Sequence, residues 1–228
     1  MRILDLVLEL IYPKRCVICG EILNYGDKSI MCVGCAEKER YADYADYKLA
    51  AAQSCHGEAY FDSCACVYYY DFVKYAVEHF KFKGFKRDSI PLGQLMYRFG
   101  SERNIFDNID FMTAVPVHKD RMKERGFNHA YELAKVLEKY TDIPVCGDML
   151  VRVKKTKPQY LLSPEERREN ITGAFKAENI EKIRNKNIML IDDIFTTGGT
   201  ANECARVLKE SGAKSVHVFE LSQSSVLK

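Results

Sequence analysis

Two neighbouring carboxylates followed by a loop of small residues are the part of this sequence best suited to chemistry. Asp192 and Asp193 follow the apolar run 188–191, and the loop residues are Thr196, Thr197, Gly198, Gly199 and Thr200. Hydroxyls and unobstructed backbone N–H groups before a helix form a phosphate cradle, because the helix dipole favours an anion there. Two acids repel a phosphate unless sugar hydroxyls or a divalent metal lie between them. The pattern indicates a ribose 5-phosphate site; the alternative is an ordinary polar turn.

A strand, a loop and a helix must hold these residues in that order. The run 188–191 predicts a buried parallel strand whose carboxyl end carries the two acids, and 201–210 predicts a helix. Further strands are predicted at 63–71, 111–117, 149–153 and 214–221, and further helices at 72–82, 89–99 and 128–140. A capping box that begins at Ser163 predicts one more helix start. The expected fold class is α/β.

A second candidate anion site follows the apolar strand at 111–117. From Val117 onward, that strand leads into a histidine and several cations: His118, Lys119, Arg121, Lys123 and Arg125. Ligands of open α/β sheets collect at the carboxyl ends of strands, so this loop suits a highly charged anion such as pyrophosphate. His118 alone is weak evidence, since a single histidine is more often structural. The interpretation requires this strand to neighbour the one that carries Asp192 and Asp193.

Two other basic segments have both a functional and an ordinary interpretation. Four cations surround Gly84: Lys81, Lys83, Lys86 and Arg87. They either contact a substrate phosphate or form solvated surface. A second basic stretch precedes and enters the helix that the capping box predicts: Lys154, Lys155, Lys157, Arg167 and Arg168. It is either a mobile loop that closes over pyrophosphate and excludes water, or a surface loop.

Two Cys-x2-Cys pairs have the spacing of a structural zinc site. Cys16 pairs with Cys19 and, twelve residues later, Cys32 pairs with Cys35. Four thiolates close a tetrahedral zinc site and leave no position open for chemistry. The alternative, four free cysteines, leaves a roughly 30-residue segment with few apolar residues and no core on which to fold. We therefore predict structural zinc.

The remaining cysteines are interpreted mainly as packing residues. Four of them are predicted to behave as small hydrophobes: Cys64, Cys66, Cys146 and Cys204. Cys55 and His56 form a dipeptide with no matching second pair, so their role stays open.

The composition is that of a globular protein with no overall attraction for nucleic acid. Its 34 basic and 32 acidic residues almost cancel, so only local patches of charge remain. The apolar segment 1–11 is too short to span a bilayer and lacks a small-residue cleavage site, so we expect a short docking helix there. Nine cysteines without an export signal favour thiols or metal over disulfides and place the chain in the cytoplasm.

The chain length predicts one α/β domain with a small appendage. Its 228 residues accommodate a domain of about 150 residues and a smaller unit. We predict an N-terminal unit at 1–54, with the helix, the zinc ribbon and a connector, and a core domain at 55–228. The connector, 36–53, is polar and tyrosine-rich with helical spacing. Its tyrosines and lysines either stack on nucleic acid or belong to a solvated helix.

Several motifs together resemble the ComF family of competence-associated, phosphoribosyltransferase-like proteins. The segment 188–200 looks like the phosphoribosyl pyrophosphate (PRPP) signature of type I phosphoribosyltransferases. The other motifs, in chain order, are PKRCVICG, MCVGC, HFKFKG, AVPVHKDRMKERGFNHA, KPQYLL and ERREN. The resemblance covers about residues 1–222. Two features depart from it: relatives carry further cysteine pairs where this chain has only Cys55, and the common RGFNQ reads RGFNH, which leaves the role of His129 open.

The resemblance implies a type I phosphoribosyltransferase fold, with a central parallel sheet flanked by helices and a small N-terminal zinc ribbon. It assigns Asp192 and Asp193 to the ribose hydroxyls and the loop Thr196–Thr200 to the 5-phosphate. It assigns the loop Val117–Lys119, to which we add Arg125, to the pyrophosphate. Magnesium would accompany PRPP, on the pyrophosphate and the ribose hydroxyls.

Two functions are consistent with the sequence. The first is an enzyme that transfers a 5-phosphoribosyl group from PRPP to an acceptor by positioning and charge stabilisation. The second is a non-catalytic sensor of PRPP or a nucleotide, whose zinc ribbon and basic loops contact single-stranded DNA or competence proteins. The sequence identifies no acceptor-binding group and does not set the oligomeric state.

Overall fold

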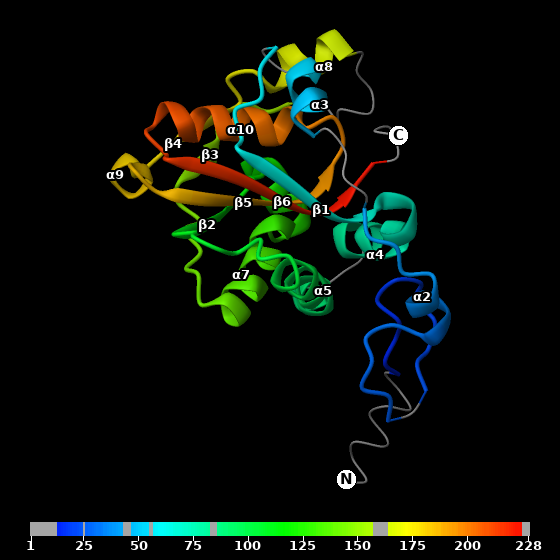
Figure 1. Ribbon diagram of the computed structural model, residues 1–228. Coiled ribbons are helices and arrows are strands. Elements are labelled where there is room, and N and C mark those ends of the chain that lie inside the picture. Colours follow the sequence, from blue (N-terminus) through cyan, green and yellow to red (C-terminus); the bar gives the residue numbers. More distant parts are fainter. Residues whose placement is uncertain are drawn as a thin grey trace.

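A four-stranded parallel sheet forms the centre of the molecule (Figure 1). The computed structural model describes residues 13–24, 26–42, 47–54, 57–82, 86–156 and 164–224. The strands lie in the order β1 (Ser63–Tyr69), β6 (Ser215–Gln223), β5 (Asn187–Phe195) and β2 (Phe111–Ala114). Each neighbouring pair is parallel. The predicted α/β class with a central parallel sheet is confirmed.

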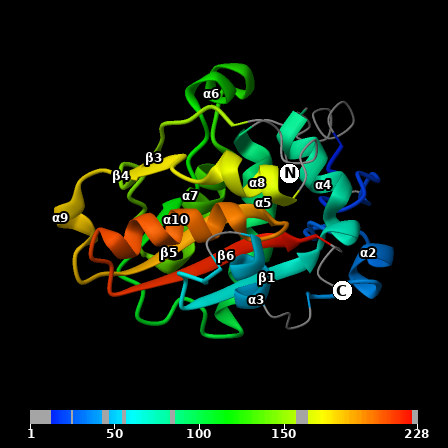
Figure 2. The ribbon, with the colours of Figure 1, turned by 90° about the horizontal axis from the view of Figure 1, so that it is seen from above.

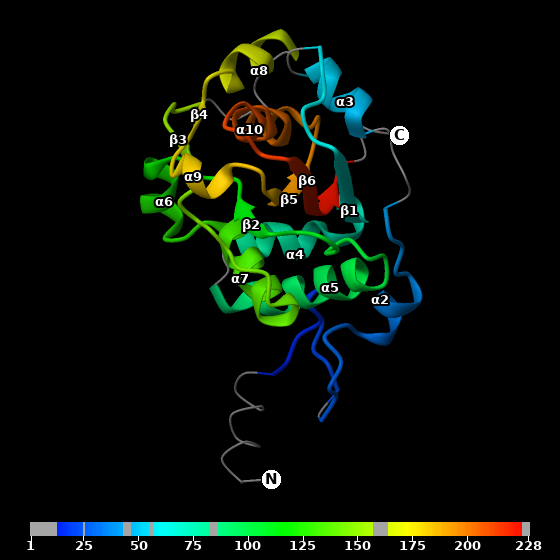
Figure 3. The ribbon, with the colours of Figure 1, turned by 60° about the vertical axis from the view of Figure 1, so that its left-hand side comes forward.

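Helices cover both faces of this sheet, as Figures 1 and 3 show. One face carries α4 (Tyr70–Phe82), α5 (Ser89–Ser101) and α7 (His129–Thr141), and the other carries α3 (Tyr47–Ser54), α8 (Pro164–Ile171) and α10 (Gly199–Glu210). Met189 and Ile191 of β5 pack on the first face, and Ile188 and Leu190 pack on the second. A strand buried on both sides needs the continuous apolar run that this sequence has.

Most predicted elements are present with shifted ends. The signature strand continues through both carboxylates to Phe195, whereas β2 ends at Ala114 instead of 117. The last ladder bond beyond β2 runs from the Val115 N–H to the Ile191 carbonyl at 3.0 Å. Pro116 has no N–H, so it cannot continue the ladder.

The shorter elements complete the described fold. Strand β3 (Leu150–Arg152) pairs antiparallel with β4 (Phe175–Ala177). Strand β4 has only three residues, which is too short for the periodicity of the sequence to reveal it. The short helices are α2 (Val33–Glu37), η1 (Lys86–Asp88), α6 (Lys119–Arg125) and α9 (Ile180–Ile183). Figure 2 shows α6 projecting away from the sheet and the helices that cover it.

The connector 36–53 is not the continuous helix that its spacing predicts. Helix α2 ends at Glu37, Tyr41 forms an antiparallel bridge with Tyr68 of β1, and α3 begins at Tyr47. The Ala42 N–H also donates to the Val67 carbonyl at 2.9 Å. An edge strand offers unpaired backbone groups, and here these groups override the local helical spacing.

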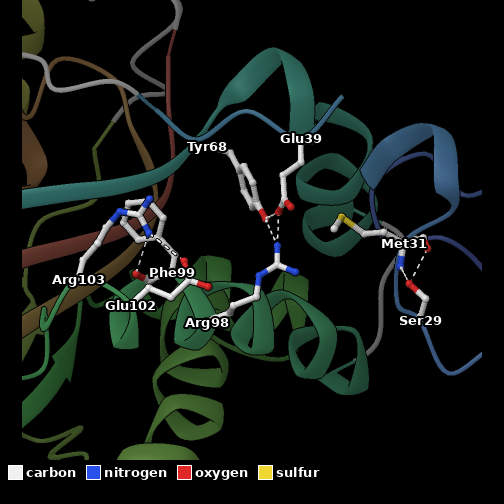
Figure 4. A network of polar contacts seen from close by, with 8 residues as sticks. All are labelled: Ser29, Met31, Glu39, Tyr68, Arg98, Phe99, Glu102 and Arg103. Atoms are coloured by element: carbon white, nitrogen blue, oxygen red, sulfur yellow. Dashed lines mark hydrogen bonds and ion pairs between the residues drawn. The ribbon is translucent and has the colours of Figure 1, made fainter. Parts of the chain in front are cut away.

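A polar network attaches the connector to the core (Figure 4). Arg98 of α5 and the Tyr68 hydroxyl both donate to the Glu39 carboxylate. Next to this network, the Arg103 guanidinium lies 4.7 Å from the Tyr41 ring centre and 4.0 Å from the Phe99 ring centre. The segment that follows the cysteine pairs is therefore held on α5 and β1 by charge and by cation–π contacts.

None of the helices in the described ranges is both long and apolar enough to cross a membrane.

Candidate functional site

The two signature carboxylates lie next to each other at the carboxyl end of β5 but have different neighbours. The Asp192 carboxylate accepts the Asp193 backbone N–H at 2.9 Å. The Asp193 carboxylate lies 2.9 Å from the Lys81 ammonium, and the two side chains are 12% and 18% exposed. Successive strand residues point to opposite faces, so Asp193 meets α4 while Asp192 faces the side covered by α10. Asp193 therefore has a cationic partner that the sequence did not indicate.

A second acid lies next to Asp192 in the sheet. Burial and the Asp193 carboxylate raise the pKa of Asp192 to about 7. Glu220 is its direct neighbour on β6 and is 1% exposed. Burial and then the Asp192 carboxylate raise the pKa of Glu220 well above its ordinary value, which favours the uncharged form of its carboxyl group.

A cation near Asp192 balances part of this acidity. Arg152 of β3 places its guanidinium carbon 5.3 Å from the Phe175 ring centre. Burial and then Arg121 lower the pKa of Arg152, while Cys204 and Asp192 oppose the change. The Arg152 Nε atom is buried without a hydrogen-bond partner in the part of the chain described. Arg152 was not among the predicted site residues, because it lies in a three-residue strand 40 positions before Asp192.

The loop after β5 has the shape of a phosphate cradle. Thr196, Thr197 and Gly198 form a bend, and the twelve-residue helix α10 begins at Gly199. Gly198 has a φ of 77°, and a Cβ there would collide with the Phe195 ring, so only glycine fits without strain. Thr200 lies in the first turn of α10. The helix N-terminus thus meets a loop of small residues, as an anion site requires.

The second predicted anion site follows the strand beside the signature strand, as its interpretation required. β2 pairs with β5, with Ala114 opposite Ile191. The loop Val117–Lys119 therefore emerges at the same edge of the sheet as Asp192 and Asp193. His118 caps α6 by accepting the Asp120 N–H at 3.3 Å. At the other end of α6, the Arg125 guanidinium carbon lies 5.5 Å from the Phe82 ring centre.

Asn128 fixes the shape of this loop, a role that the sequence did not reveal. Its side-chain amide donates to the Val115 carbonyl at 3.0 Å, and its side-chain oxygen caps α7 by accepting the Tyr131 N–H. An asparagine at a helix start is an ordinary cap. The second bond, back to the end of β2, is what sets the path of the loop.

His129 is a buried packing residue. It is 2% exposed, its Nε2 lies 3.1 Å from the Phe80 carbonyl, and its ring packs against Phe80 and Phe127. Burial lowers the pKa of His129, although Asp193 opposes the change. The sequence left the role of His129 open, and these contacts give it a place in the packing of α7 against α4.

The variant His129→Gln should lose less folding stability than the wild type when the pH falls from 8 to 5.5. The folded-state pKa of His129 lies below the unfolded value of about 6.5, so the unfolded state binds more protons as the pH falls through that value. Stability is therefore lost towards lower pH in the wild type, and a glutamine that donates to Phe80 removes this contribution. Urea midpoints at pH 8 and pH 5.5 measure it. Equal losses in the two proteins would contradict the assignment.

The four cysteines of the two pairs lie together, as predicted. The Sγ atoms of Cys16, Cys19, Cys32 and Cys35 all lie within 4.8 Å of one another. Zinc–sulfur bonds of about 2.3 Å at tetrahedral angles separate two sulfurs by about 3.8 Å. The Cys19 and Cys32 sulfurs are 3.8 Å apart. The donor set and its dimensions therefore fit a structural zinc ion.

The other predicted positions divide into two groups. Cys66 and Cys204 are buried in the core, as predicted, and Cys64 and Cys146 are partly buried. Several positions with predicted roles lie outside the described residues: the segment 1–12, Cys55, His56, Lys83, Gly84 and Lys157. In the second basic stretch, Lys155 pairs with Asp120 at 2.8 Å and Lys154 donates to the Glu169 carbonyl at 3.1 Å.

Comparison with known proteins adds a family to this geometry. Residues 122–221 match the model of the phosphoribosyl transferase domain. That range contains Arg125, both signature carboxylates and the loop before α10. Among solved structures, the glutamine PRPP amidotransferase from B. subtilis is 18% identical, with a TM-score of 0.39, over 58% of this chain and 25% of its own.

Curated relatives match more of the chain. Competence protein F of Haemophilus influenzae is 27% identical over 92% of this chain and 97% of its own length. Competence protein ComFC of Bacillus subtilis is 33% identical over 68% of this chain and 62% of its own. DNA utilization protein YhgH of Escherichia coli K12 is 30% identical, and the match spans about half of each chain. Over most of its length the chain is thus similar to competence protein F and ComFC, and it carries a phosphoribosyltransferase domain, in agreement with the resemblance to the ComF family.

Proposed function

We propose that this protein binds PRPP at the carboxyl edge of the sheet and transfers or recognises its 5-phosphoribosyl group. Asp192 and Asp193 hold the ribose hydroxyls, and Thr196–Thr200 holds the 5-phosphate. Val117–Lys119 and Arg125 hold the pyrophosphate. The parallel pairing of β2 with β5 is the observation that carries the proposal. It supports a single site in which the two acids lie between two anion-binding loops.

The donor set fits a magnesium ion that arrives with the ligand. Asp193 already pairs with Lys81, and one Asp192 oxygen already accepts a backbone N–H. Magnesium is usually bound by one or two carboxylates together with substrate phosphates. Magnesium would supply charge neutralisation on the pyrophosphate, close to Asp192 and Asp193.

The residues of the chain would act by position and charge. Breaking the bond between ribose C1 and pyrophosphate leaves positive charge on the sugar and negative charge on the leaving group. Asp192 and Asp193 orient the ribose and face the positive side, while Lys119 and Arg125 face the negative side. Lys81 limits the repulsion between the Asp193 carboxylate and an incoming phosphate.

The names of the relatives suggest the cellular process in which this protein acts. Relatives are named competence proteins and a DNA utilization protein. We extend this link to the present chain as a role in DNA uptake in the cytoplasm, with competence proteins as candidate partners. Calorimetric titration with PRPP, with and without magnesium, tests the ligand assignment. Magnesium-dependent binding supports it, and the absence of binding at millimolar PRPP would overturn it.

A groove beside the cysteine cluster favours single-stranded DNA binding as the second candidate function. Its volume is about 620 Å³, and it lies between the segment 13–20 and helices α4 and α5. Three cations, one histidine, one tyrosine and one acid are among its lining residues: Lys14, Arg15, Arg87, His79, Tyr75 and Asp88. Proteins bind single-stranded nucleic acid through cations along its phosphate backbone and through aromatic rings on which its bases stack.

The groove assignment predicts a salt-dependent loss of DNA binding in the double variant Arg15→Gln, Arg87→Gln. The plot of log affinity against log salt concentration has a negative slope, and each lost phosphate contact reduces its magnitude by about 0.7. The slope of the double variant should therefore be smaller in magnitude by about 1.4. Fluorescence anisotropy of a labelled oligothymidine at several salt concentrations measures both the affinity and this slope. Lys182→Gln with Arg184→Gln, on and after α9, is the matched control. Equal binding by the groove variant, or no wild-type binding at low salt, would reject this function.

A further inference from the structure

A chain of side-chain hydrogen bonds crosses the amino end of the sheet. Ser63, Ser215 and Asn187 are the first residues of β1, β6 and β5, and His217 is the third residue of β6. The Ser63 hydroxyl oxygen lies 2.8 Å from His217 Nδ1, and His217 Nε2 lies 2.9 Å from the Ser215 hydroxyl oxygen. The Ser215 hydroxyl donates to the Asn187 side-chain oxygen at 2.8 Å. All four residues lie at the edge of the sheet opposite the signature carboxylates, so the proposed PRPP site does not use them.

The number of protons gives each bond of this chain a direction. The Ser215 hydroxyl has one proton, which it donates to Asn187, so it accepts a hydrogen bond from His217. The Nε2 atom of His217 therefore carries the ring proton. In the neutral imidazole the Nδ1 atom is then an acceptor, and the Ser63 hydroxyl donates to it. The proton of Ser63 thus points at a base that two further residues hold in one tautomer.

The surroundings of His217 favour this neutral form. Burial has the largest effect and lowers the pKa of His217, while Asp62 raises this pKa and Lys209 lowers it. The Lys209 ammonium pairs with the Asp62 carboxylate at 2.6 Å, which limits the effect of either charge on the ring. An uncharged imidazole at neutral pH can take the proton of Ser63, as a general base must.

The backbone of Ser63 supplies a donor for negative charge. In the ladder between β1 and β6, the Asp62 N–H donates to the Val216 carbonyl at 2.7 Å. Successive N–H groups of a strand point to opposite edges, so the Ser63 N–H points away from β6. It can donate to the oxyanion that forms when the Ser63 hydroxyl attacks a carbonyl. One donor stabilises an oxyanion less than the pair that serine hydrolases use, so an ester with a good leaving group is the fitting substrate.

We propose that Ser63 is a nucleophile, that His217 is its general base, and that this edge of the sheet is a second reactive site for activated acyl esters. Ser215 and Asn187 are positioning residues, because they fix the His217 tautomer without touching the ester. The Ser63 oxygen forms a bond to the acyl carbon while its proton moves to His217 Nδ1. The ester C–O bond breaks, and the leaving oxygen takes its electron pair and that proton. Water then hydrolyses the acyl-serine by the same steps and restores the hydroxyl.

Labelling of the full chain with a fluorophosphonate tests the nucleophile, because an activated serine oxygen replaces fluoride on its phosphorus. Peptide mass spectrometry compares Ser63 with Ser101, which ends α5 and donates to the Arg98 carbonyl instead of a histidine. Ser63 should react about 100-fold faster than Ser101, and His217→Gln should remove this advantage. With p-nitrophenyl acetate, the wild type should release a burst of about one p-nitrophenolate per chain, and Ser63→Ala should release none.

Two variants of Ser215 test the positioning role. Ser215→Ala should slow the labelling of Ser63 by about tenfold, because the hydrogen bond that fixes the tautomer is lost. Ser215→Thr keeps the hydroxyl and should restore most of the rate. All variants should bind PRPP as the wild type does, which shows that the fold is intact. Equal labelling of Ser63 and Ser101, or an unchanged rate in His217→Gln, would reject the nucleophile. A Ser215→Ala protein that reacts as fast as the wild type would reject the positioning role.

Discussion

Replacing both signature carboxylates, in the double variant Asp192→Asn, Asp193→Asn, should lower the affinity for PRPP by about 100-fold or more. Hydrogen bonds to charged groups contribute about 1.5–3 kcal/mol each, so two of them account for about 3–6 kcal/mol. Asparagine keeps the side-chain volume and still accepts the Asp193 backbone N–H at position 192. The fold should therefore persist. Isothermal titration of PRPP with magnesium measures the loss.

A matched pair of surface acids controls for the change in net charge. Asp107→Asn with Asp142→Asn removes two exposed carboxylates outside the proposed site, and its PRPP affinity should equal that of the wild type. The zinc content of both double variants should also be unchanged. If the signature variant binds PRPP as tightly as the wild type, the assignment of the ribose hydroxyls to Asp192 and Asp193 is wrong.

Lys81 determines how the two single variants should differ. Asp193→Asn leaves the Lys81 ammonium without its 2.9 Å partner, and the Lys81 side chain is only 18% exposed. A partly buried cation without a partner is destabilising and attracts anions. Asp193→Asn alone should therefore lose less affinity for PRPP than Asp192→Asn, because the released ammonium compensates in part.

The parts of the site that could be predicted are those whose residues lie close together in the sequence. Acids that follow an apolar strand, a glycine turn before a helix and two cysteine pairs are local patterns. Each of them produced the local structure expected of it. The neighbouring position of β2 and β5 was a requirement of the pyrophosphate interpretation, and the sheet order meets it.

The parts that could not be predicted depend on contacts between distant segments. Lys81 precedes Asp193 by 112 positions, and only the packing of α4 on the sheet brings them together. Glu220 reads as one polar residue in an apolar strand, and its register opposite Asp192 becomes visible only in the sheet. The helix predicted for residues 38–42 is wrong for a similar reason. These residues bond to the backbone of β1, and the local spacing of the sequence does not reveal that partner.

The variant Cys16→Ser should reduce zinc from about one ion per chain to almost none. A serine hydroxyl is a poor zinc ligand at neutral pH, and three thiolates do not close a structural site. Cys16 is 1% exposed and packs in the same core as Ile18, Leu23 and Met31. Apparent binding energies of structural zinc are about 10–16 kcal/mol, so losing the ion should unfold the segment that the four cysteines enclose.

Elemental analysis measures the loss of zinc, and limited proteolysis measures the unfolding of the segment that the four cysteines enclose. Cys146→Ser makes the same chemical change at a partly buried cysteine outside the cluster, so it should keep full zinc and resist cleavage. In Cys16→Ser, cleavage should concentrate between residues 13 and 40, while the parallel sheet keeps its circular dichroism. The Glu39 contact with Arg98 should limit cleavage to the part of that segment before Glu39. A Cys16→Ser protein that still carries one zinc would show that the ion is held elsewhere in the chain.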